Sequence, residues 1–271
     1  MELITSEKEF LDTVDYLKNC GKSVGRFAFN GTLHDGHKHI LEKIRPECDI
    51  LVADLVHYMR FHPATDENAW SNPDINLVKE QLKEGPKVDF FIFNNFVDNI
   101  HEKRVFIKEN FLQKFVSYGE SINLNRDLIL HAAGLELTSA VDYVSTSYIG
   151  PKNAVVVLLA EKIFERKLSW NWKIIWSCYR TDGYIAVSRT RGSIVLSKIA
   201  LKAVEQIKNG VIDVSLFEKL MYDYYLENPK ITVLDLKTLE RINTLSDNCV
   251  LIFMDSRKSD FVFIKEGELI F

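Results

Sequence analysis

The sequence has few cysteines, almost no excess charge and no long apolar run. Its four cysteines lie far apart and form no CxxC pair; they are Cys20, Cys48, Cys178 and Cys249. This spacing argues against a disulfide framework or a cysteine metal cage and is typical of reduced thiols in a cytoplasmic protein. Lysine and arginine total 34 against 38 aspartates and glutamates, a net charge of −4, which does not favour a general nucleic-acid or membrane-surface binder.

Two further absences concern targeting and repetition. No apolar segment approaches the roughly 20 residues that a membrane span needs. The first ten residues, MELITSEKEF, carry acidic side chains where a signal peptide would have a basic and then an apolar run. No internal repeat or low-complexity tract is present. We therefore expect a globular, cytoplasmic protein that binds neither membranes nor nucleic acid.

What the sequence does contain is an alternation of apolar strands with amphipathic helices. The elements predicted in the first hundred residues are a helix at 5–19, a strand at 23–29, a helix ending near 45, a strand at 49–56, a helix at 74–83 and a strand at 88–93. This order predicts an α/β fold with a Rossmann-like, doubly wound parallel sheet and right-handed crossovers. Strands at 143–149 and 172–178 are predicted around an apolar helix at 154–164. The chain between 95 and 147 gives no clear pattern.

The composition changes near residue 180. The elements predicted beyond it are helices at 194–208 and 215–226 and strands at 230–235, 250–254, 261–264 and 269–271. Short strands after helices favour a small α+β unit. We therefore predict a Rossmann-like domain over 1–178 and a smaller C-terminal domain over 179–271 that closes over the active site.

The segment 23–40, SVGRFAFNGTLHDGHKHI, is a buried strand, a glycine turn and a helix start. A helix that begins directly after a strand leaves backbone N–H groups and a positive dipole end where an anion can sit. His34 and His37 flank Gly36 there and could donate hydrogen bonds to phosphate oxygens. Two other interpretations remain open at this point: surface or capping histidines, and a zinc site that lacks an evident third ligand.

Three other loops repeat this placement of polar groups after strands. The loop 57–63 leaves the second strand, where open α/β sheets place their ligands. Gly150-Pro151-Lys152-Asn153 is another turn before a helix, and its lysine could reach a triphosphate. Ser188 and Arg189 follow Asp182-Gly183 and could clamp phosphate oxygens. Taken singly, a lysine or an arginine in such a loop is usually a solvated side chain.

In this order and at these separations, the motifs resemble the pantothenate synthetase family, the pantoate:beta-alanine ligases of the HIGH-type nucleotidyltransferase superfamily. Residues 31–37, GTLHDGH, match the family's GxLHxGH, and Met59-Arg60-Phe61 falls on its M/T-Q-F. Residues 150–153 lie on its GEKD, and 182–190, DGYIAVSRT, lie without gaps on its DGLAxSSRN. The tail from 231 to 264 is similar to the family's small C-terminal domain. The resemblance covers nearly the whole chain.

The resemblance implies that a carboxylate attacks the α-phosphate of ATP, giving an acyl adenylate and pyrophosphate, and that an amine then displaces AMP to form an amide. It implies catalytic roles for His34, His37, Lys152, Ser188 and Arg189. It implies nucleotide contacts for Gly31, Gly36, Gly150, Asn153 and Val187. Mg²⁺ would accompany ATP without a protein metal site, the substrates would be a small carboxylic acid and an amine, and the chain would form a homodimer.

The departures from the family pattern concern the acid. The positions that the resemblance implies for acid binding are Asn30, Met59, Arg60 and Val156. Asn30 replaces the family's methionine, Arg60 replaces a glutamine, and Val156, beside Val155, replaces another glutamine. These changes suggest a different acid, one with an additional negative charge or a planar carboxylate for Arg60. Two alternatives stay open: a nucleotidyltransferase that ends at an activated product, and a non-catalytic nucleotide-binding paralogue.

Overall fold

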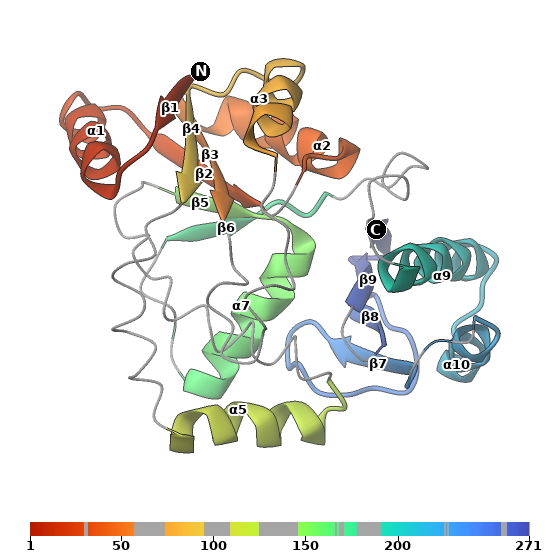
Figure 1. The fold of residues 1–271 in the computed structure, drawn as a ribbon. Coiled ribbons are helices and arrows are strands. Elements are labelled where there is room, and N and C mark those ends of the chain that lie inside the picture. The colour runs from red at the N-terminus through yellow and green to blue at the C-terminus, as the bar shows by residue number, and fades with distance from the viewer. Residues whose placement is uncertain are drawn as a thin grey trace.

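The structure is a computed structural model that describes most of the chain. The described residues are 1–29, 32–56, 74–94, 109–124, 146–165, 167, 171–177, 191–224, 226, 228–255 and 259–270. They form two sheets with helices packed around them (Figure 1). No helix in these ranges is both long and apolar enough to cross a membrane.

The first sheet has six strands in the order β1-β4-β3-β2-β5-β6, and every pair is parallel. The strands are β1 (Glu2–Ile4), β2 (Val24–Phe29), β3 (Ile50–Val56), β4 (Phe90–Asn94), β5 (Thr146–Ile149) and β6 (Trp172–Ile174). From β2 the chain builds the sheet outward through β3 and β4, then returns to the other side of β2 with β5 and β6. This confirms the predicted doubly wound parallel sheet. The three-residue β1 was not predicted, because it is too short for a periodic pattern.

Helices cover both faces of this sheet. The helices are α1 (Glu7–Asn19), α2 (Asp35–Ile44), α3 (Ile75–Lys83), α5 (Glu109–Ser121) and α7 (Pro151–Phe164), with a 3-10 turn η1 (Arg45–Glu47). One buried cluster joins α2 and α3 to one face, and another joins α1 and α7 to the opposite face. Figure 1 shows α1 across the sheet from α2 and α3. Helix α5 lies in the region for which no topology was predicted.

Local sequence explains where several helices begin. Ser6 accepts the backbone N–H of Glu9 at the start of α1, and Asp74 accepts those of Asn76 and Leu77 at the start of α3, as expected for N-caps. Helix α7 begins at Pro151, three residues before the predicted start, because proline suits the first helical position. Strand β6 ends at Ile174, four residues before the predicted end.

The second sheet has four antiparallel strands in the order β10-β9-β8-β7. Its elements are α9 (Arg191–Lys208), α10 (Val214–Tyr222), β7 (Lys230–Asp235), β8 (Asn248–Met254), β9 (Ser259–Lys265) and β10 (Glu268–Ile270). Helix α10 ends at Tyr222, four residues earlier than predicted. The predicted small α+β unit is therefore present. The predicted boundary between 178 and 179 lies outside the described residues and stays a prediction.

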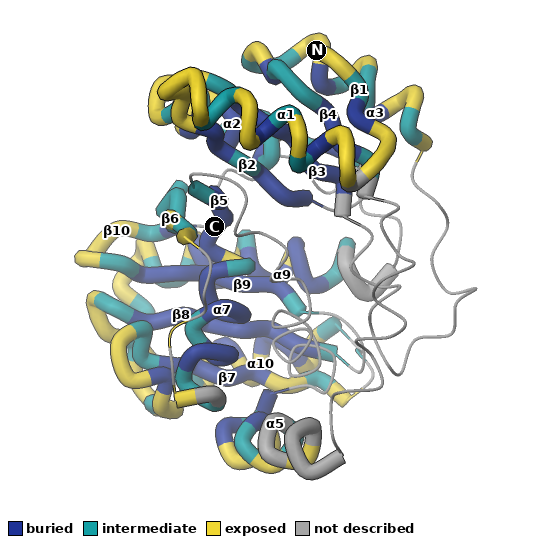
Figure 2. Tube along the Cα trace, turned by 90° about the vertical axis from the view of Figure 1, so that its left-hand side faces the viewer, coloured by how far each residue is buried: buried dark blue, intermediate teal, exposed yellow. Residues whose placement is uncertain are grey.

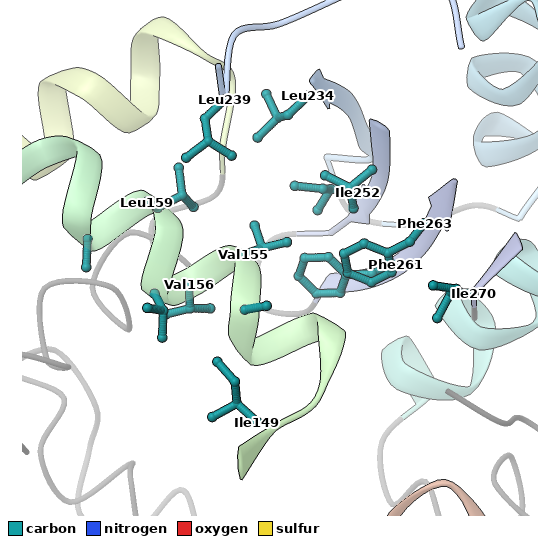
Figure 3. Close-up of a cluster of buried hydrophobic side chains, with 14 of the residues drawn as sticks. Ile149, Val155, Val156, Leu159, Leu234, Leu239, Ile252, Phe261, Phe263 and Ile270 are labelled. Carbon is teal, nitrogen blue, oxygen red and sulfur yellow. The ribbon is translucent and has the colours of Figure 1, made fainter. Parts of the chain in front are cut away.

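Both faces of the second sheet are buried, which is uncommon for antiparallel strands. In β8, Cys249, Leu251 and Phe253 pack with α9 and α10, whereas Val250 and Ile252 pack in the cluster that contains α7. Figure 3 shows Val155 and Leu159 of α7 on the side that faces this sheet. Helix α7 thus packs on both sheets, which accounts for its strongly apolar sequence. Figure 2 shows β7, β8 and β9 of the second sheet as mostly buried.

The centre of the first sheet is closely packed at Gly25 in β2. A Cβ atom there would lie 2.7 Å from Sγ of Cys48 and 2.7 Å from Cε2 of Tyr148. These two side chains come from the segment before β3 and from β5. The absence of a side chain at Gly25 therefore leaves room for Cys48, just before β3, and for Tyr148 of β5.

Candidate functional site

The described motif residues meet at the point where the strand order reverses. β2 leads to α2 on one face of the sheet, and its neighbour β5 leads to α7 on the other. Ligands of open parallel sheets bind outside the carboxyl ends of strands at such a point. Gly150, between β5 and α7, is buried, and a Cβ atom on it would lie 3.0 Å from Cδ1 of Ile40 in α2. The start of α7 therefore lies against the second turn of α2.

His34 and His37 form a stacked pair at the start of α2. Their ring centroids are 3.7 Å apart with an interplanar angle of 22°. The backbone N–H of His37 donates to Nδ1 of His34 at 3.3 Å, and that of His34 donates to Nδ1 of His37 at 3.4 Å. Each Nδ1 accepts a hydrogen bond from a backbone N–H group, so the neutral form of each ring carries its own proton on Nε2. The histidines therefore cap the helix and also present Nε2–H donors, so the two interpretations of the sequence are compatible.

The turn that carries the histidines is held from α3. Leu33, buried just before His34, donates its backbone N–H to Oε1 of Gln81 at 2.9 Å, and its carbonyl accepts from Nε2 of Gln81 at 3.1 Å. One side-chain amide thus satisfies both polar backbone groups of a buried residue. This pairing fixes the position of His34, and no sequence pattern indicated it.

His37 lies among aromatic rings on the α2 side of the sheet. Its ring centroid is 6.0 Å from that of Phe27 and 5.7 Å from that of Phe29. Burial, and to a lesser extent the neighbouring His34, lower the pKa of His37 well below its ordinary value. The ring is therefore neutral at physiological pH, which suits a hydrogen-bond donor whose Nδ1 is already used as an acceptor.

This shift makes the stability of the protein depend on pH. The pKa of His37 is lower in the folded chain than the unfolded value of about 6.5, so the unfolded chain binds the proton first as the pH falls. The contribution of His37 is therefore complete above about pH 6.5 and is lost as the pH falls toward the folded-state pKa.

We expect the free energy of unfolding, measured with urea at pH 7.5 and 5.5, to fall more steeply in the wild type than in His37→Gln. The difference is at most about 1.4 kcal/mol per pH unit. Glutamine at this position can still complete the capping box, so the comparison isolates the titration. Equal pH dependence of the two proteins would contradict the prediction.

The N-terminus of α7 differs from that of α2 because no side chain caps it. Gly150 has no side chain, and Pro151 has no N–H, so the backbone N–H groups of Lys152 and Asn153 begin the helix. An uncapped helix start of this kind is a suitable anion site. Lys152 itself is exposed; its ammonium group donates to the carbonyl oxygen of Ser259 at 3.0 Å and lies 5.1 Å from the centroid of the Phe261 ring. In this arrangement the lysine contacts β9.

The structure places the remaining predicted residues unevenly. Gly36 is buried in the first turn of α2, and Asn153 is partly buried in the first turn of α7. Val156 is 1% exposed and belongs to the apolar cluster around α7. The other predicted contacts lie outside the described residues: Asn30, Gly31, Met59, Arg60, Val187, Ser188 and Arg189. Their roles stay predictions.

Two polar contacts near the site were not predicted. Arg26 in β2 donates from Nε to Oδ2 of Asp54 in β3 at 2.7 Å, and one of its terminal nitrogens contacts the same oxygen. His39 in α2 contacts the hydroxyl of Ser177, which follows β6. A single charged residue inside each of two apolar strands, VGRFAF and ILVADLV, is a sequence signal that could have indicated the first contact. Among the described residues, no group of three or more histidine, cysteine, aspartate or glutamate side chains could hold a metal ion.

Comparison with known proteins agrees with this arrangement. No family model matches the chain. The pantothenate synthetase of Rhizobium etli is 22% identical over 276 residues, which cover 93% of this chain and 88% of that protein. A pantothenate synthetase of Bacillus cereus is 33% identical over 84 residues, 30% of each chain.

Solved structures are similar over the whole chain. The pantothenate synthetase of Thermus thermophilus aligns with a TM-score of 0.67 at 14% identity and covers 98% of this chain and 100% of that one. The pantoate-beta-alanine ligase of Francisella tularensis, complexed with beta-gamma ATP and beta-alanine, aligns with a TM-score of 0.56 at 15% identity over 96% of each chain. At such identities the structures establish the fold. The sequence matches show that the chain is similar to pantothenate synthetases over most of its length and divergent from them.

Proposed function

We propose that this protein is an ATP-dependent carboxylate–amine ligase that works through an acyl adenylate. The observation that carries the proposal is the histidine pair. His34 and His37 use Nδ1 to hold the helix start, and we assign their Nε2–H groups as donors to a ligand at the carboxyl end of β2. Donors that are held in place before charge develops on a phosphate lower the activation barrier without forming a covalent bond to the substrate.

The described residues fit a nucleoside triphosphate. The histidine donors lie at the start of α2. The start of α7, whose N-cap Gly150 lies against Ile40 of α2, offers backbone N–H groups with no capping side chain. Such an arrangement suits the charge of phosphate oxygens. In the proposed complex the Lys152 ammonium leaves the Ser259 carbonyl and turns toward the phosphates, and Ser188 and Arg189 add further donors. ATP would bring Mg²⁺, held mainly by phosphate oxygens and water.

The proposed substrates are a carboxylic acid and an amine. Pantoate and beta-alanine are the first candidates, because the similar proteins carry the names pantothenate synthetase and pantoate-beta-alanine ligase. The replacements Asn30, Arg60 and Val156 favour an acid other than pantoate. We further propose that the enzyme acts in the cytoplasm as a homodimer, as the family resemblance implies.

The proposal predicts that the purified protein releases pyrophosphate and AMP when ATP, Mg²⁺, an acid and an amine are supplied together. Pantoate with beta-alanine is tested first, followed by a panel of other acids and amines, with the amide detected by mass spectrometry. A stable nucleotide conjugate without amide would indicate nucleotidyl transfer instead. Background release with every pair would identify a non-catalytic protein, and calorimetry with ATP would then show whether that protein binds the nucleotide.

A further inference from the structure

Two buried oxygen atoms beside Arg26 have no hydrogen-bond partner within the part of the chain that the structure describes. They are Oδ1 of Asp54 and Oγ of Ser147, and both residues are 2% exposed. A buried polar atom without a partner is costly, so native proteins nearly always provide one, as protein, water or ligand. The two atoms therefore indicate a missing partner.

The strand register places the two residues on either side of Arg26. Arg26 lies directly beside Ser147 in the β2–β5 pairing, and Asp54 of β3 lies opposite Ala28, two residues along β2. A guanidinium fork usually gives one N–H to each carboxylate oxygen. Here two nitrogens of Arg26 contact Oδ2 alone, which leaves Oδ1 for another group.

The cluster lies on the sheet face that α7 covers. Val24, Val52 and Ile149 belong to the same apolar cluster as α7, and Arg26, Asp54 and Ser147 are each two residues from one of them in a strand. Side chains two apart in a strand share a face. Val156 in α7, at a position that the family resemblance assigns to acid binding, packs in the same cluster. The three polar residues and Val156 therefore border one apolar cluster, on the face of the first sheet that α7 covers.

We propose that Arg26, Asp54 and Ser147 form the polar floor of the acid pocket and select an acid that carries a hydroxyl or ammonium group. Oδ1 of Asp54 is an acceptor for such a group, and the Ser147 hydroxyl can both donate and accept. Specificity of this kind is strong, because an analogue without the group leaves the buried oxygens unpaired. Burial raises the pKa of Asp54, while Arg26 opposes the shift. In the ionised carboxylate Oδ1 accepts a hydrogen bond from the ligand, and in the neutral carboxyl group it carries the proton and donates one. The inference rests on the proposed ligase function.

The test compares butanoate with 2-, 3- and 4-hydroxybutanoate and 2-aminobutanoate, acids that share one carbon skeleton. Pyrophosphate release is measured with the wild type, Ser147→Ala and the double variant Arg26→Leu/Asp54→Leu, which removes both charges together. We expect the wild type to show a KM about tenfold lower or more for at least one substituted acid than for butanoate. In both variants we expect the ratio between the KM for butanoate and the KM for the preferred substituted acid to fall toward one. Gln206→Met is the matched control, because Oε1 of Gln206 in α9 is also buried without a described partner.

Other outcomes would overturn the inference. If a trapped water satisfies the two oxygens, the wild type does not discriminate among the acids, or its preference survives in the double variant. If no acid supports pyrophosphate release, the ligase proposal fails, and thermal unfolding with the same acids still tests the pocket. In that case a rise in Tm with a substituted acid, present in the wild type and absent in Ser147→Ala, would retain the subsite, and no rise would remove it.

Discussion

Replacing His34 with asparagine is expected to lower ATP-dependent pyrophosphate release by about 10²- to 10³-fold, the usual cost of removing one donor to a developing oxyanion. Asparagine is chosen because it is a good N-cap. It can accept the backbone N–H of His37 as Nδ1 of His34 does, but its short side chain cannot extend to the position of Nε2. The variant therefore keeps the helix start and removes the proposed phosphate donor.

Two further variants separate catalysis from folding. His34→Ala removes both the cap and the donor, and should also lower the free energy of unfolding by about 1 kcal/mol. His39→Ala, on the same helix, removes a ring that contacts Ser177 and Glu42. It should leave the rate within about threefold of wild type, since it removes no proposed donor. Full activity of a folded His34→Asn protein would contradict the role assigned to the histidine pair.

The second large effect concerns stability. Arg26→Leu is expected to lower the free energy of unfolding by about 3–5 kcal/mol, because it leaves the Asp54 carboxylate buried without its cation. The side chains of Arg26 and Asp54 are 11% and 3% exposed, so bulk solvent screens their charges little. The double variant Arg26→Leu/Asp54→Leu should recover wild-type stability or exceed it, since apolar residues often replace a buried ion pair without loss. Urea unfolding of the wild type, Arg26→Leu and the double variant measures these differences in the free energy of unfolding.

The pH dependence of Arg26→Leu provides an independent check. Burial already raises the pKa of Asp54 above its unfolded value, and removal of Arg26 raises it further. A carboxyl group with a raised folded-state pKa favours folding at low pH and disfavours it as the pH rises through that pKa. The defect of Arg26→Leu should therefore be larger at pH 7 than near pH 4.5.

Lys173→Met is the control that breaks an ion pair at the surface in place of the buried Arg26–Asp54 pair. The Lys173–Glu47 pair is about half exposed on both sides, so its loss should cost less than about 1 kcal/mol. An equally small loss in Arg26→Leu would show that the buried pair contributes no more than a surface pair.

Much of the fold followed from local pattern. The strands 23–29 and 49–56 are apolar runs that end at polar or glycine turns, and periodic helices separate them, so their parallel pairing is the expected arrangement. The histidine and lysine motifs were placed correctly after β2 and β5, because a strand-to-helix turn is itself a sequence feature. The short β1 and helix α5 were missed, since neither gives a strong periodic signal.

The site shows the limit of such inference most clearly at Lys152 and Val156. Lys152 donates to the carbonyl oxygen of Ser259, a residue 107 positions away. Val156 is buried because its own helix, α7, packs on two sheets. Neither contact has a local signature, because each depends on how α7 and β9 approach in space. The same holds for Gln81, whose amide pairs with Leu33 across 48 positions.

The amino-acid sequence alone specified most of the strands and helices, the parallel pairing of the first sheet and the histidines at the start of α2, because periodicity, caps and turns act between neighbouring residues. Tertiary packing specified the rest. It stacked His34 on His37, paired Arg26 with Asp54, and buried Oδ1 of Asp54 and Oγ of Ser147 without a described partner. Side chains from different strands meet only when the sheet forms, and burial then gives them energies that no local pattern expresses.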